Sequence, residues 1–326
     1  MPIKFKTASK GRASINKHYS CLDALIVKYL SLITVAGCVL LSACSPSSTP
    51  EVAVIPPVIA PQLELDVLDA IVLGDGAMPV VSGSWPRFAP DISWNWQLQG
   101  DVDTSFDVDV FVLDMFQMFE GNVIETLHAQ NKHVICYFSA GTFEPWCPDA
   151  GLFEEAMFGN EHFAYDNERW LDITSERTRK IMVNRMDMAQ ALGCDGVDLD
   201  NVDGFTADTG LGITLEQELE YLKVLANEAH KRNLTVVMNN AIEAIPEVVD
   251  YFDLAINELC YSLDECETYT AMIAAGKPVF HVEYEQSFVN DSMARAEMCA
   301  QSATQNIRTL VVPRLLDGSY RLSCDQ

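Results

Sequence analysis

Eight short apolar segments recur between residues 91 and 326, and their spacing constrains the fold more than any other feature of this 326-residue chain. They span residues 94–98, 108–113, 133–138, 196–199, 234–238, 252–256, 278–282 and 309–312. Near-continuous apolar runs are typical of parallel strands that are covered on both faces. The region is close to the roughly 250 residues of a single (β/α)8 barrel. We therefore predict an α/β fold, a (β/α)8 TIM barrel over residues 91–326, with a doubly wound open sheet as the alternative.

Helical patterns lie between most of these segments. The sequence TLEQ at residues 214–217 is a capping box, in which the threonine and glutamine side chains satisfy backbone N–H groups at a helix start. A second helix begins near Thr174 or Ser175 and buries Met182 and Met186 in the core. Residues 99–107 are too few for a full helix, so the first crossover is predicted to be irregular.

The N-terminus has the features of an export signal. Residues 1–28 carry six basic residues against Asp23, and the uncharged stretch 29–43 is shorter than the roughly 20 residues of a membrane span. The stretch ends in LSAC, which resembles a bacterial lipobox and implies lipidation at Cys44. We predict a signal peptide over residues 1–43 and an exported protein held at the outer membrane by its lipid anchor only. A conventional signal peptide or an uncleaved anchor is the alternative.

The mature chain is strongly acidic behind a polar linker. Residues 44–90 are rich in proline, serine and small apolar residues without a sustained period, which predicts a tether. Without residues 1–43 the chain retains 15 Lys and Arg against 46 Asp and Glu, a net charge of -31. A surface of that charge repels nucleic acid, so we predict no nucleic-acid partner.

Most of the predicted strands end in carboxylate or amide side chains. These residues are Asp114, Asp198, Asp200, Asn201, Asn239, Asn257, Glu258 and Glu283, the last followed by Tyr284. Taken singly, such an acid is more often a solvated loop residue or a helix cap. Because active sites of TIM barrels lie at the C-terminal ends of the strands, five such ends together predict a functional site.

The motif inventory excludes several chemistries. The sequence has no Gly-x-Ser-x-Gly elbow, no His-Glu-x-x-His, no paired Cys-x-x-Cys and no glycine-rich phosphate loop, so we predict neither a metal nor a cofactor. A calcium site was weighed for the acids at residues 101, 103, 107 and 109, although the glycine and glutamate of an EF-hand are missing. Paired carboxylates near aromatic residues instead fit glycosidic cleavage, which needs one acid to protonate the leaving oxygen and one carboxylate to attack or to activate water.

Five motifs in order resemble glycoside hydrolase family 114. They are WNWQL at 94–98, VICYFSAG at 134–141, GCDGVD at 193–198 with DNVDG at 200–204, NELC at 257–260 and VEY at 282–284. The resemblance covers about residues 91–325 and implies a (β/α)8 barrel, endo-acting cleavage of α-1,4-linked galactosamine polymers, and a carboxylate pair at Asp200 and Glu258. One departure is Cys147, where the family usually places an arginine after Glu144-Pro145-Trp146.

We predict Asp200 as the nucleophile and Glu258 as the acid/base. Predicted substrate contacts are Trp96, Asp114, Tyr137, Glu144, Asp198, Asn201, Asp203, Asn239, Asn257, Glu283 and Tyr284. The predicted partner is a cationic aminosugar polysaccharide, which an acidic protein attracts, and the protein is expected to act as a monomer. A polysaccharide-binding lipoprotein without turnover is the stronger rival function, and a deacetylase on the same barrel is the weaker one.

The mature cysteines predict disulfides, because an exported protein meets an oxidising compartment. We expect Cys260 to pair with Cys266 and Cys299 with Cys324. Cys136, Cys147 and Cys194 then compete for a third bond, with Cys136 expected to be a buried thiol because it lies on a strand.

Overall fold

The computed structural model describes residues 65–326 apart from residues 120, 164 and 326. The predicted signal peptide, the lipidation site Cys44 and the first part of the predicted tether lie outside the described residues. Within the described part of the chain, no helix is both long and apolar enough to cross a membrane.

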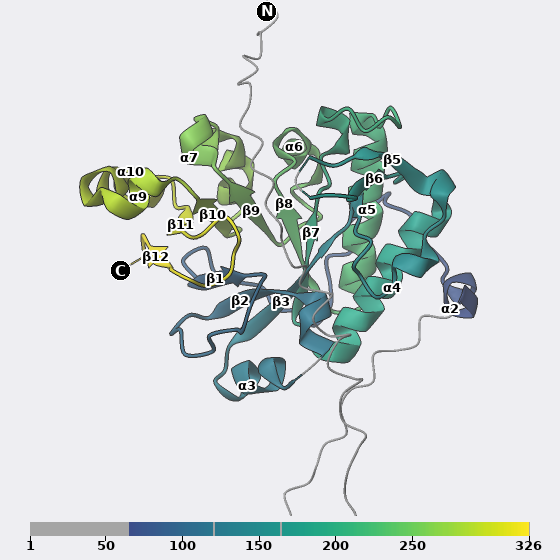
Figure 1. Ribbon diagram of the computed structural model, residues 1–326, viewed down its shortest axis with the longest axis horizontal. Helices are drawn as coiled ribbons and strands as arrows, with labels where there is room; N and C mark the ends of the chain where they lie inside the picture. The colour runs from purple at the N-terminus through teal and green to yellow at the C-terminus, as the bar shows by residue number, and fades with distance from the viewer. Residues whose placement is uncertain (1–64, 120, 164, 326) are drawn as a thin grey trace, which may run out of the picture.

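Eight parallel strands form the core sheet, which curls into a barrel (Figure 1). They are β1 (Trp94–Gln97), β2 (Val110–Asp114), β3 (His133–Ser139), β7 (Gly196–Asp200), β8 (Thr235–Asn239), β9 (Leu254–Glu258), β10 (Val279–Glu283) and β11 (Arg308–Val311). Each strand pairs in parallel with the next one in this order. All eight predicted apolar segments therefore form strands, and the predicted (β/α)8 class is confirmed.

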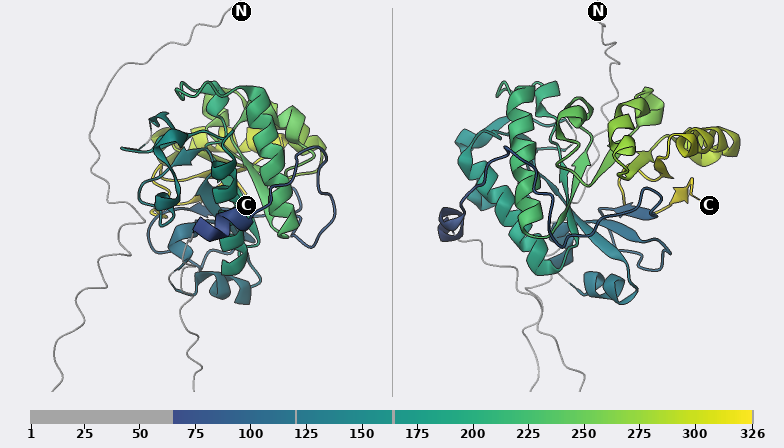
Figure 2. Two further views of the ribbon diagram at one scale, coloured as in Figure 1. Left: turned by 90° about the vertical axis from the view of Figure 1, so that its right-hand side faces the viewer. Right: turned by 180° about the vertical axis from the view of Figure 1, so that it is seen from behind.

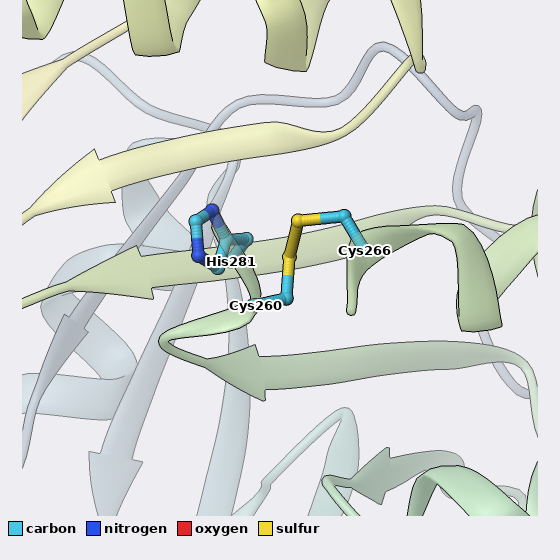
Figure 3. Close-up of side chains that lie close together, drawn as sticks. All are labelled: Cys260, Cys266 and His281. Carbon is cyan, nitrogen blue, oxygen red and sulfur yellow. A yellow bond between two sulfur atoms is a disulfide. The ribbon is translucent and has the colours of Figure 1, made fainter. Parts of the chain in front are cut away.

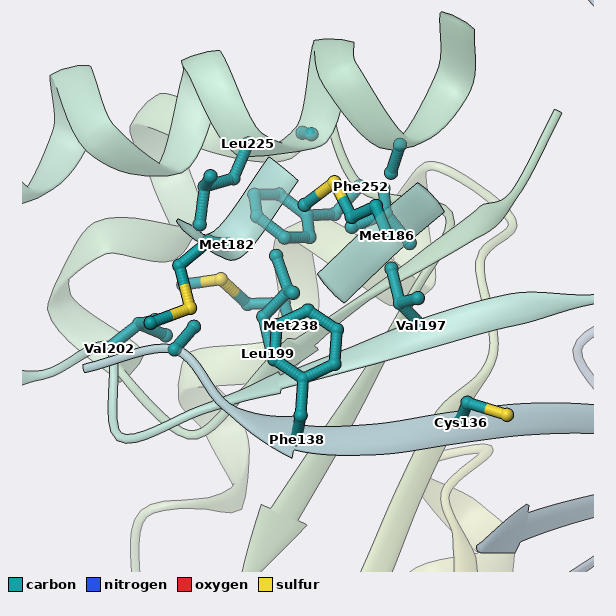
Figure 4. Packing of buried hydrophobic residues seen from close by; sticks show 14 of the residues in the cluster. Cys136, Phe138, Met182, Met186, Val197, Leu199, Val202, Leu225, Met238 and Phe252 are labelled. Carbon is teal, nitrogen blue, oxygen red and sulfur yellow. The ribbon is translucent and has the colours of Figure 1, made fainter. Parts of the chain in front are cut away.

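The two faces of each strand meet different neighbours, because successive side chains point to opposite sides. One set, which includes Val112, Ile256 and Leu310, packs together inside the barrel. The other set packs against the helices. Figure 4 shows part of this outer layer, with Phe138, Val197, Leu199 and Met238 of the strands beside Met182, Met186 and Leu225 of the helices.

Helices fill the crossovers between most strands. They are α3 (Val123–Ala129), α4 (Glu176–Leu192), α5 (Leu215–Lys231), α6 (Ile245–Val248), α7 (Cys260–Leu263), α8 (Thr270–Ala274), α9 (Gln286–Asn290) and α10 (Ser292–Thr304). Short 3-10 turns are η2 (Met115–Phe119), η3 (Ala150–Leu152), η4 (Glu155–Met157), η5 (Gly204–Thr206), η6 (Ile242–Ala244) and η7 (Cys266–Tyr269). The Thr214 capping box and the Ser175 cap are both present, which confirms the two predicted helix starts. No helix joins β1 to β2, as predicted for this described crossover.

A small antiparallel sheet is inserted between β3 and α4. It consists of β4 (Thr142–Phe143), β5 (Phe158–Glu161) and β6 (Arg169–Leu171), in the order β4-β6-β5. Phe143 packs on Phe158 with ring centroids 4.4 Å apart. The insertion is joined to the carboxyl end of the barrel, because the Leu171 amide donates to the Gly141 carbonyl at 2.9 Å.

The barrel closes between β11 and β1 through side chains and through the loop after β11, where the Leu316 carbonyl accepts the Leu98 and Gln99 N–H groups at 2.9 and 3.1 Å. The short strand β12 (Leu322–Ser323) pairs antiparallel with β11. The Trp94 indole N–H donates to the Arg308 carbonyl at 3.0 Å, and Arg321 donates to the Trp94 carbonyl at 2.7 Å. Trp94 also stacks on Phe280 inside the barrel at 4.4 Å. These contacts replace a backbone ladder at the seam.

Residues 65–90 pack on the barrel, although we predicted them as part of the tether. Helix α2 (Leu65–Ala70) lies beside α4 at the edge of the molecule (Figure 2). Trp85 is buried, stacks on His230 at 4.1 Å and donates its indole N–H to Asp253 at 3.0 Å. The predicted domain boundary at residue 91 is therefore placed too late, because a proline-rich composition hid the buried tryptophan.

Three disulfides form among the described residues. Cys260–Cys266 and Cys299–Cys324 are as predicted. The third is Cys136–Cys194, with Cα atoms 5.9 Å apart, so the expectation of a buried Cys136 thiol was wrong. Cys136 lies in the outer layer of β3, close to the turn that carries Cys194 from α4 into β7.

Candidate active site

Asp200 and Glu258 occupy the inward-facing ends of β7 and β9, with β8 between them. Glu258 has the same parity as Leu254 and Ile256 of the inner cluster, and Asp200 has the parity opposite to the outer residues Val197 and Leu199. Burial raises the pKa of Asp200 to about 7, and the charge of Glu258 is the second cause. The two carboxyls therefore interact electrostatically at the rim of the barrel.

Asp200 is held by donors from two strands. The Tyr137 hydroxyl of β3 donates to Oδ2 at 2.8 Å, and the Asn201 backbone N–H donates to Oδ1 at 2.8 Å. Both hydrogen bonds favour the carboxylate and oppose the effect of burial. A pKa near 7 leaves Asp200 partly protonated at neutral pH, so its ionisation depends on the charges around it.

Glu258 has its own pair of donors. The Tyr284 hydroxyl donates to Oε1 at 2.5 Å, and the Asn240 amide donates to Oε2 at 3.0 Å. The Asn240 carbonyl oxygen in turn accepts the Glu258 backbone N–H at 2.9 Å, so one asparagine orients both the chain and the carboxyl. Asn240 was not among the predicted contacts, which included its neighbour Asn239 instead.

The first residue after each of β7, β8 and β9 is a non-glycine residue with positive φ. Asn201 after β7 has φ 58°, Asn240 after β8 has φ 49° and Leu259 after β9 has φ 68°. The left-handed region is tolerated by asparagine but is strained for leucine. Such strain clusters at functional sites, and here it turns the chain sharply behind Asp200 and Glu258.

Asp198 and Asn239 lie beneath the rim and not on it. Asp198 is fully buried, and burial followed by the charge of Asp200 raises its pKa well above the usual range. The Asn239 amide faces both Asp198 oxygens, at 3.2 and 3.3 Å. Both side chains are too buried to contact a polymer, so the expected direct contacts are not supported. Asp198 and Asn239 instead form a hydrogen-bonded layer below the pair.

Further acids and aromatic side chains surround the pair. Burial raises the pKa of Asp114 to about 6, and burial followed by the charge of Glu168 raises that of Glu144 to about 8. Burial also raises the pKa of Asp203.

Tyr165 lies in the insertion, and burial raises its pKa to about 12. The charges of Glu168, Glu144, Asp200 and Glu258 add to this shift. Tyr165 was not among the predicted contacts, because it lies in a segment with no periodic pattern.

Asn257 and Glu283 face away from the barrel interior, because each differs by one position from an inward residue. The Asn257 carbonyl oxygen accepts the Cys260 N–H at 2.9 Å, and the Asn257 amide donates to the Asn240 carbonyl oxygen at 3.3 Å. Glu283 is fully buried, accepts two hydrogen bonds from Ser262 at 2.9 and 2.5 Å, and contacts His281 at 3.2 Å. Their oxygens brace α7, so the predicted substrate contacts are wrong for both residues.

Trp96 faces inward but is only 3% exposed, which leaves no ring face for a sugar. Its predicted substrate contact is therefore not supported, and its ring belongs to the packed interior.

Asn201 remains partly exposed at the rim. Gly141 makes this position possible, since a Cβ there would lie 1.6 Å from the Asn201 carbonyl oxygen. The other predicted contacts, Tyr137 and Tyr284, both reach the carboxyl pair.

One cluster in the described residues resembles a set of metal ligands, namely Cys260, Cys266 and His281 (Figure 3). The two sulfur atoms are bonded to each other, so neither is available as a thiolate. The acids considered for calcium are held separately: Asp103 accepts from Ser105, and Asp107 pairs with Lys132 at 2.9 Å. The described part of the chain therefore offers no convergent metal site at the barrel rim.

Comparison with known proteins identifies the family. The model of glycoside hydrolase family GH114 matches residues 77–326. Ega3 of Aspergillus fumigatus, whose crystal structure is a complex with galactosamine, is 33% identical and superposes with a TM-score of 0.69, covering 74% of this chain and 99% of that chain. The chain belongs to glycoside hydrolase family 114.

A second structure of similar architecture is the glycoside hydrolase domain of PelA from Pseudomonas aeruginosa. It is 17% identical, has a TM-score of 0.58, and covers 71% of this chain and 98% of that chain, which supports the shared fold alone. Among curated proteins, none matches the chain. The family 114 match confirms the resemblance that five sequence motifs indicated, and its start at residue 77 agrees with the folded segment before residue 91.

Proposed function

We propose that this family 114 glycoside hydrolase cleaves internal α-1,4 linkages of galactosamine-containing polysaccharide with Asp200 and Glu258. The observation that supports this most strongly is the carboxyl pair itself: two rim carboxyls on alternate strands, coupled in charge and each held by a tyrosine hydroxyl. The galactosamine in the Ega3 complex supports the substrate class.

In the proposed mechanism Asp200 attacks the anomeric carbon while Glu258 donates its proton to the leaving glycosidic oxygen. The C–O bond to the leaving sugar breaks as the ester bond to Asp200 forms. Glu258, now a carboxylate, then removes a proton from water, and the hydroxide attacks the anomeric carbon and releases Asp200. Tyr137 and the Asn201 N–H stabilise the Asp200 carboxylate before attack and after release.

A cationic substrate fits the electrostatics of this site. An ammonium group near Asp200 lowers the pKa of that carboxyl from about 7 and so favours the ionised nucleophile. Because the charge of Glu258 contributes to the shift, a proton on Glu258 also favours ionisation of Asp200. Substrate binding thereby promotes the arrangement that the reaction needs, a carboxylate on β7 and an acid on β9.

The cellular setting is part of the proposal. Cys44, at the end of the lipobox-like sequence, is proposed to carry the lipid that holds the enzyme at the outer membrane. Incorporation of labelled palmitate that disappears in a Cys44→Ala variant is the expected result. Equal labelling of the variant would remove the anchor from the account without affecting the enzyme assignment.

The test of the activity uses the full-length protein purified in detergent. We expect new reducing ends from α-1,4-galactosamine polymer and a ladder of oligosaccharides early in the reaction, which is the signature of endo cleavage. Polymers of glucosamine serve as the control. Retention of galactosamine oligomers without new reducing ends would identify the rival binding protein, and release of acetate without chain cleavage would identify a deacetylase.

A further inference from the structure

A line of hydrogen bonds leads from Asp200 into the inserted sheet. The Asn201 side-chain amide lies 2.9 Å from the Ser139 hydroxyl, and that hydroxyl lies 2.5 Å from the Thr142 hydroxyl. Thr142 contacts Glu168 Oε1 at 2.6 Å, and the other Glu168 oxygen contacts His162 Nδ1 at 3.0 Å. The proposed mechanism uses none of these last four groups.

The chemistry of the groups fixes the direction of this line. The Glu168 carboxylate only accepts, so Thr142 donates its single hydroxyl hydrogen to Glu168. Thr142 then has only an acceptor to offer Ser139, and Ser139 must donate to it. The Ser139 oxygen is left as an acceptor for Asn201, so the NH2 end of the Asn201 amide points at Ser139. The Asn201 Nδ2 atom also lies 3.4 Å from Thr142 Oγ1, and its second hydrogen faces Asp200 Oδ2, which is likewise 3.4 Å from Nδ2.

The direction depends on the charge of Glu168. A donor at that position would allow every hydroxyl to reverse, and the carbonyl end of Asn201 would then face the Asp200 carboxylate. Glu168 and His162 are well shielded, with side chains 3% and 7% exposed. Burial lowers the pKa of His162, but its hydrogen bond to Glu168 and the charge of Glu168 outweigh this effect and raise it overall. The imidazolium form of His162 pairs with the Glu168 carboxylate and so maintains the accepting end of the line.

We propose that Glu168 and His162 are positioning residues, which set the direction of the Thr142–Ser139–Asn201 line and so keep an amide donor on the nucleophile. This inference rests on the proposed function, because it takes Asp200 as the attacking group. Neither residue touches the sugar. Their effect on turnover passes through two buried hydroxyls, which makes it separable from substrate binding.

Thr142 offers a matched pair of variants for the test. Thr142→Val keeps the volume of the side chain and removes the hydroxyl, whereas Thr142→Ser keeps the hydroxyl and loses a methyl group. We expect Thr142→Val to lower kcat by about 10- to 100-fold, the effect of losing a hydrogen bond to a charged group, with KM on galactosamine oligosaccharides nearly unchanged. Thr142→Ser should remain close to wild type. If Thr142 only filled space, the order of the two variants would be reversed.

Wild-type kcat in folded Thr142→Val protein, or equal losses in both variants, would overturn the proposal. If Thr142→Val does not fold, Ser139→Ala interrupts the same line while leaving the Thr142 to Glu168 contact intact, and the same loss of kcat is expected. Unchanged turnover of Ser139→Ala would also overturn it. A failure of the proposed function can be told apart from a failure of this inference. If the proposed function were wrong, the wild-type protein would release no oligosaccharides, or the Asp200→Asn variant would remain active.

Discussion

Neighbouring residues at the ends of β9 and β10 have different roles, because one faces the interior of the barrel and the other faces the helices. Glu258 and Tyr284 face inward and are hydrogen bonded to each other. Asn257 and Glu283, one position earlier, face outward and hold α7 through Cys260 and Ser262. The inner members of each pair are arranged for chemistry and the outer members for stability.

The pKa shifts follow the same division. Burial raises the pKa of Asp114 and Asp200, inward residues of β2 and β7, to about 6 and 7, and that of Glu144, which follows β4, to about 8; these three are called the inner acids below. The pKa of Glu283 is lowered instead, because hydrogen bonds from His281 and Ser262 outweigh its burial. Burying an acid costs folding free energy, and such a cost is retained where a site needs a proton near neutral pH.

The largest expected effect is the difference in kcat between substitutions at Glu258 and at its neighbour Asn257. Glu258→Gln removes the proposed acid and should lower kcat by about 100- to 10,000-fold, the usual range for general acid catalysis, with little change in melting temperature. Asn257→Ala should leave kcat within a few-fold and lower the melting temperature by several degrees. Reducing-end assays and thermal unfolding of the two variants measure this, and similar losses of activity in both would erase the distinction between the two faces.

The next comparison pairs Tyr284 with Glu283. Tyr284→Phe removes one donor to Glu258 and should reduce kcat about tenfold without loss of stability. Glu283→Ala leaves Ser262 and His281 without their buried acceptor and should cost about 3 kcal/mol of unfolding free energy. Urea titration and kinetics of the same preparations give both quantities. A stable Glu283→Ala protein with impaired turnover would place Glu283 in the reaction after all.

The sequence was sufficient for the fold because its signals are local and periodic. Eight apolar runs and two helix caps each predicted an element that is present. The site was predicted less well, since adjacent residues at the ends of β9 and β10 were both assigned to the site although side chains alternate between faces. Applying that period to β9 and β10 would have removed Asn257 and Glu283.

Other parts of the site have no such signal. Glu168 and Tyr165 come from the inserted segment, where contacts depend on how β5 and β6 fold over the rim. Asn240 differs from Asn239 only in its left-handed backbone, which the dipeptide leaves open. The Cys136–Cys194 bond joins residues 58 positions apart, so its partner choice depends on tertiary structure.

The pH dependence of stability sharpens the contrast between inner and outer acids. An inner acid with a raised pKa holds its proton in the folded protein where the unfolded chain has released it, so its stabilisation is complete below about pH 4 and is lost as the pH rises to about 8. We expect the unfolding free energy to fall as the pH rises from about 5 to about 8, and Glu144→Gln to reduce that slope. Glu283, with its lowered pKa, contributes stability that is lost only as the pH falls below about 4.5. Urea unfolding midpoints measured across this pH range test the prediction. If the unfolding free energy rose with pH instead, the raised pKa values of the inner acids would be contradicted.

The smallest expected effect concerns salt. The ammonium groups of a cationic polymer are attracted by the acidic residues around the site. Salt screens this attraction, so it should weaken substrate binding without altering the chemical step. Raising NaCl from about 50 to about 500 mM should increase KM several-fold at constant kcat. Fully N-acetylated oligomers, which are neutral, provide the control, and an equal salt effect on them would show that the charge of the acids does not attract the substrate.

The central claim is that Asp200 attacks the sugar, and azide rescue tests it most directly. Asp200→Gly leaves a space on the face opposite the leaving group, where azide replaces the missing carboxylate. With an aryl α-glycoside of a galactosamine oligosaccharide, we predict recovered aryl alcohol release and a β-glycosyl azide product. An α-glycosyl azide from this variant, or full turnover without azide, would show that another group forms the bond to the anomeric carbon.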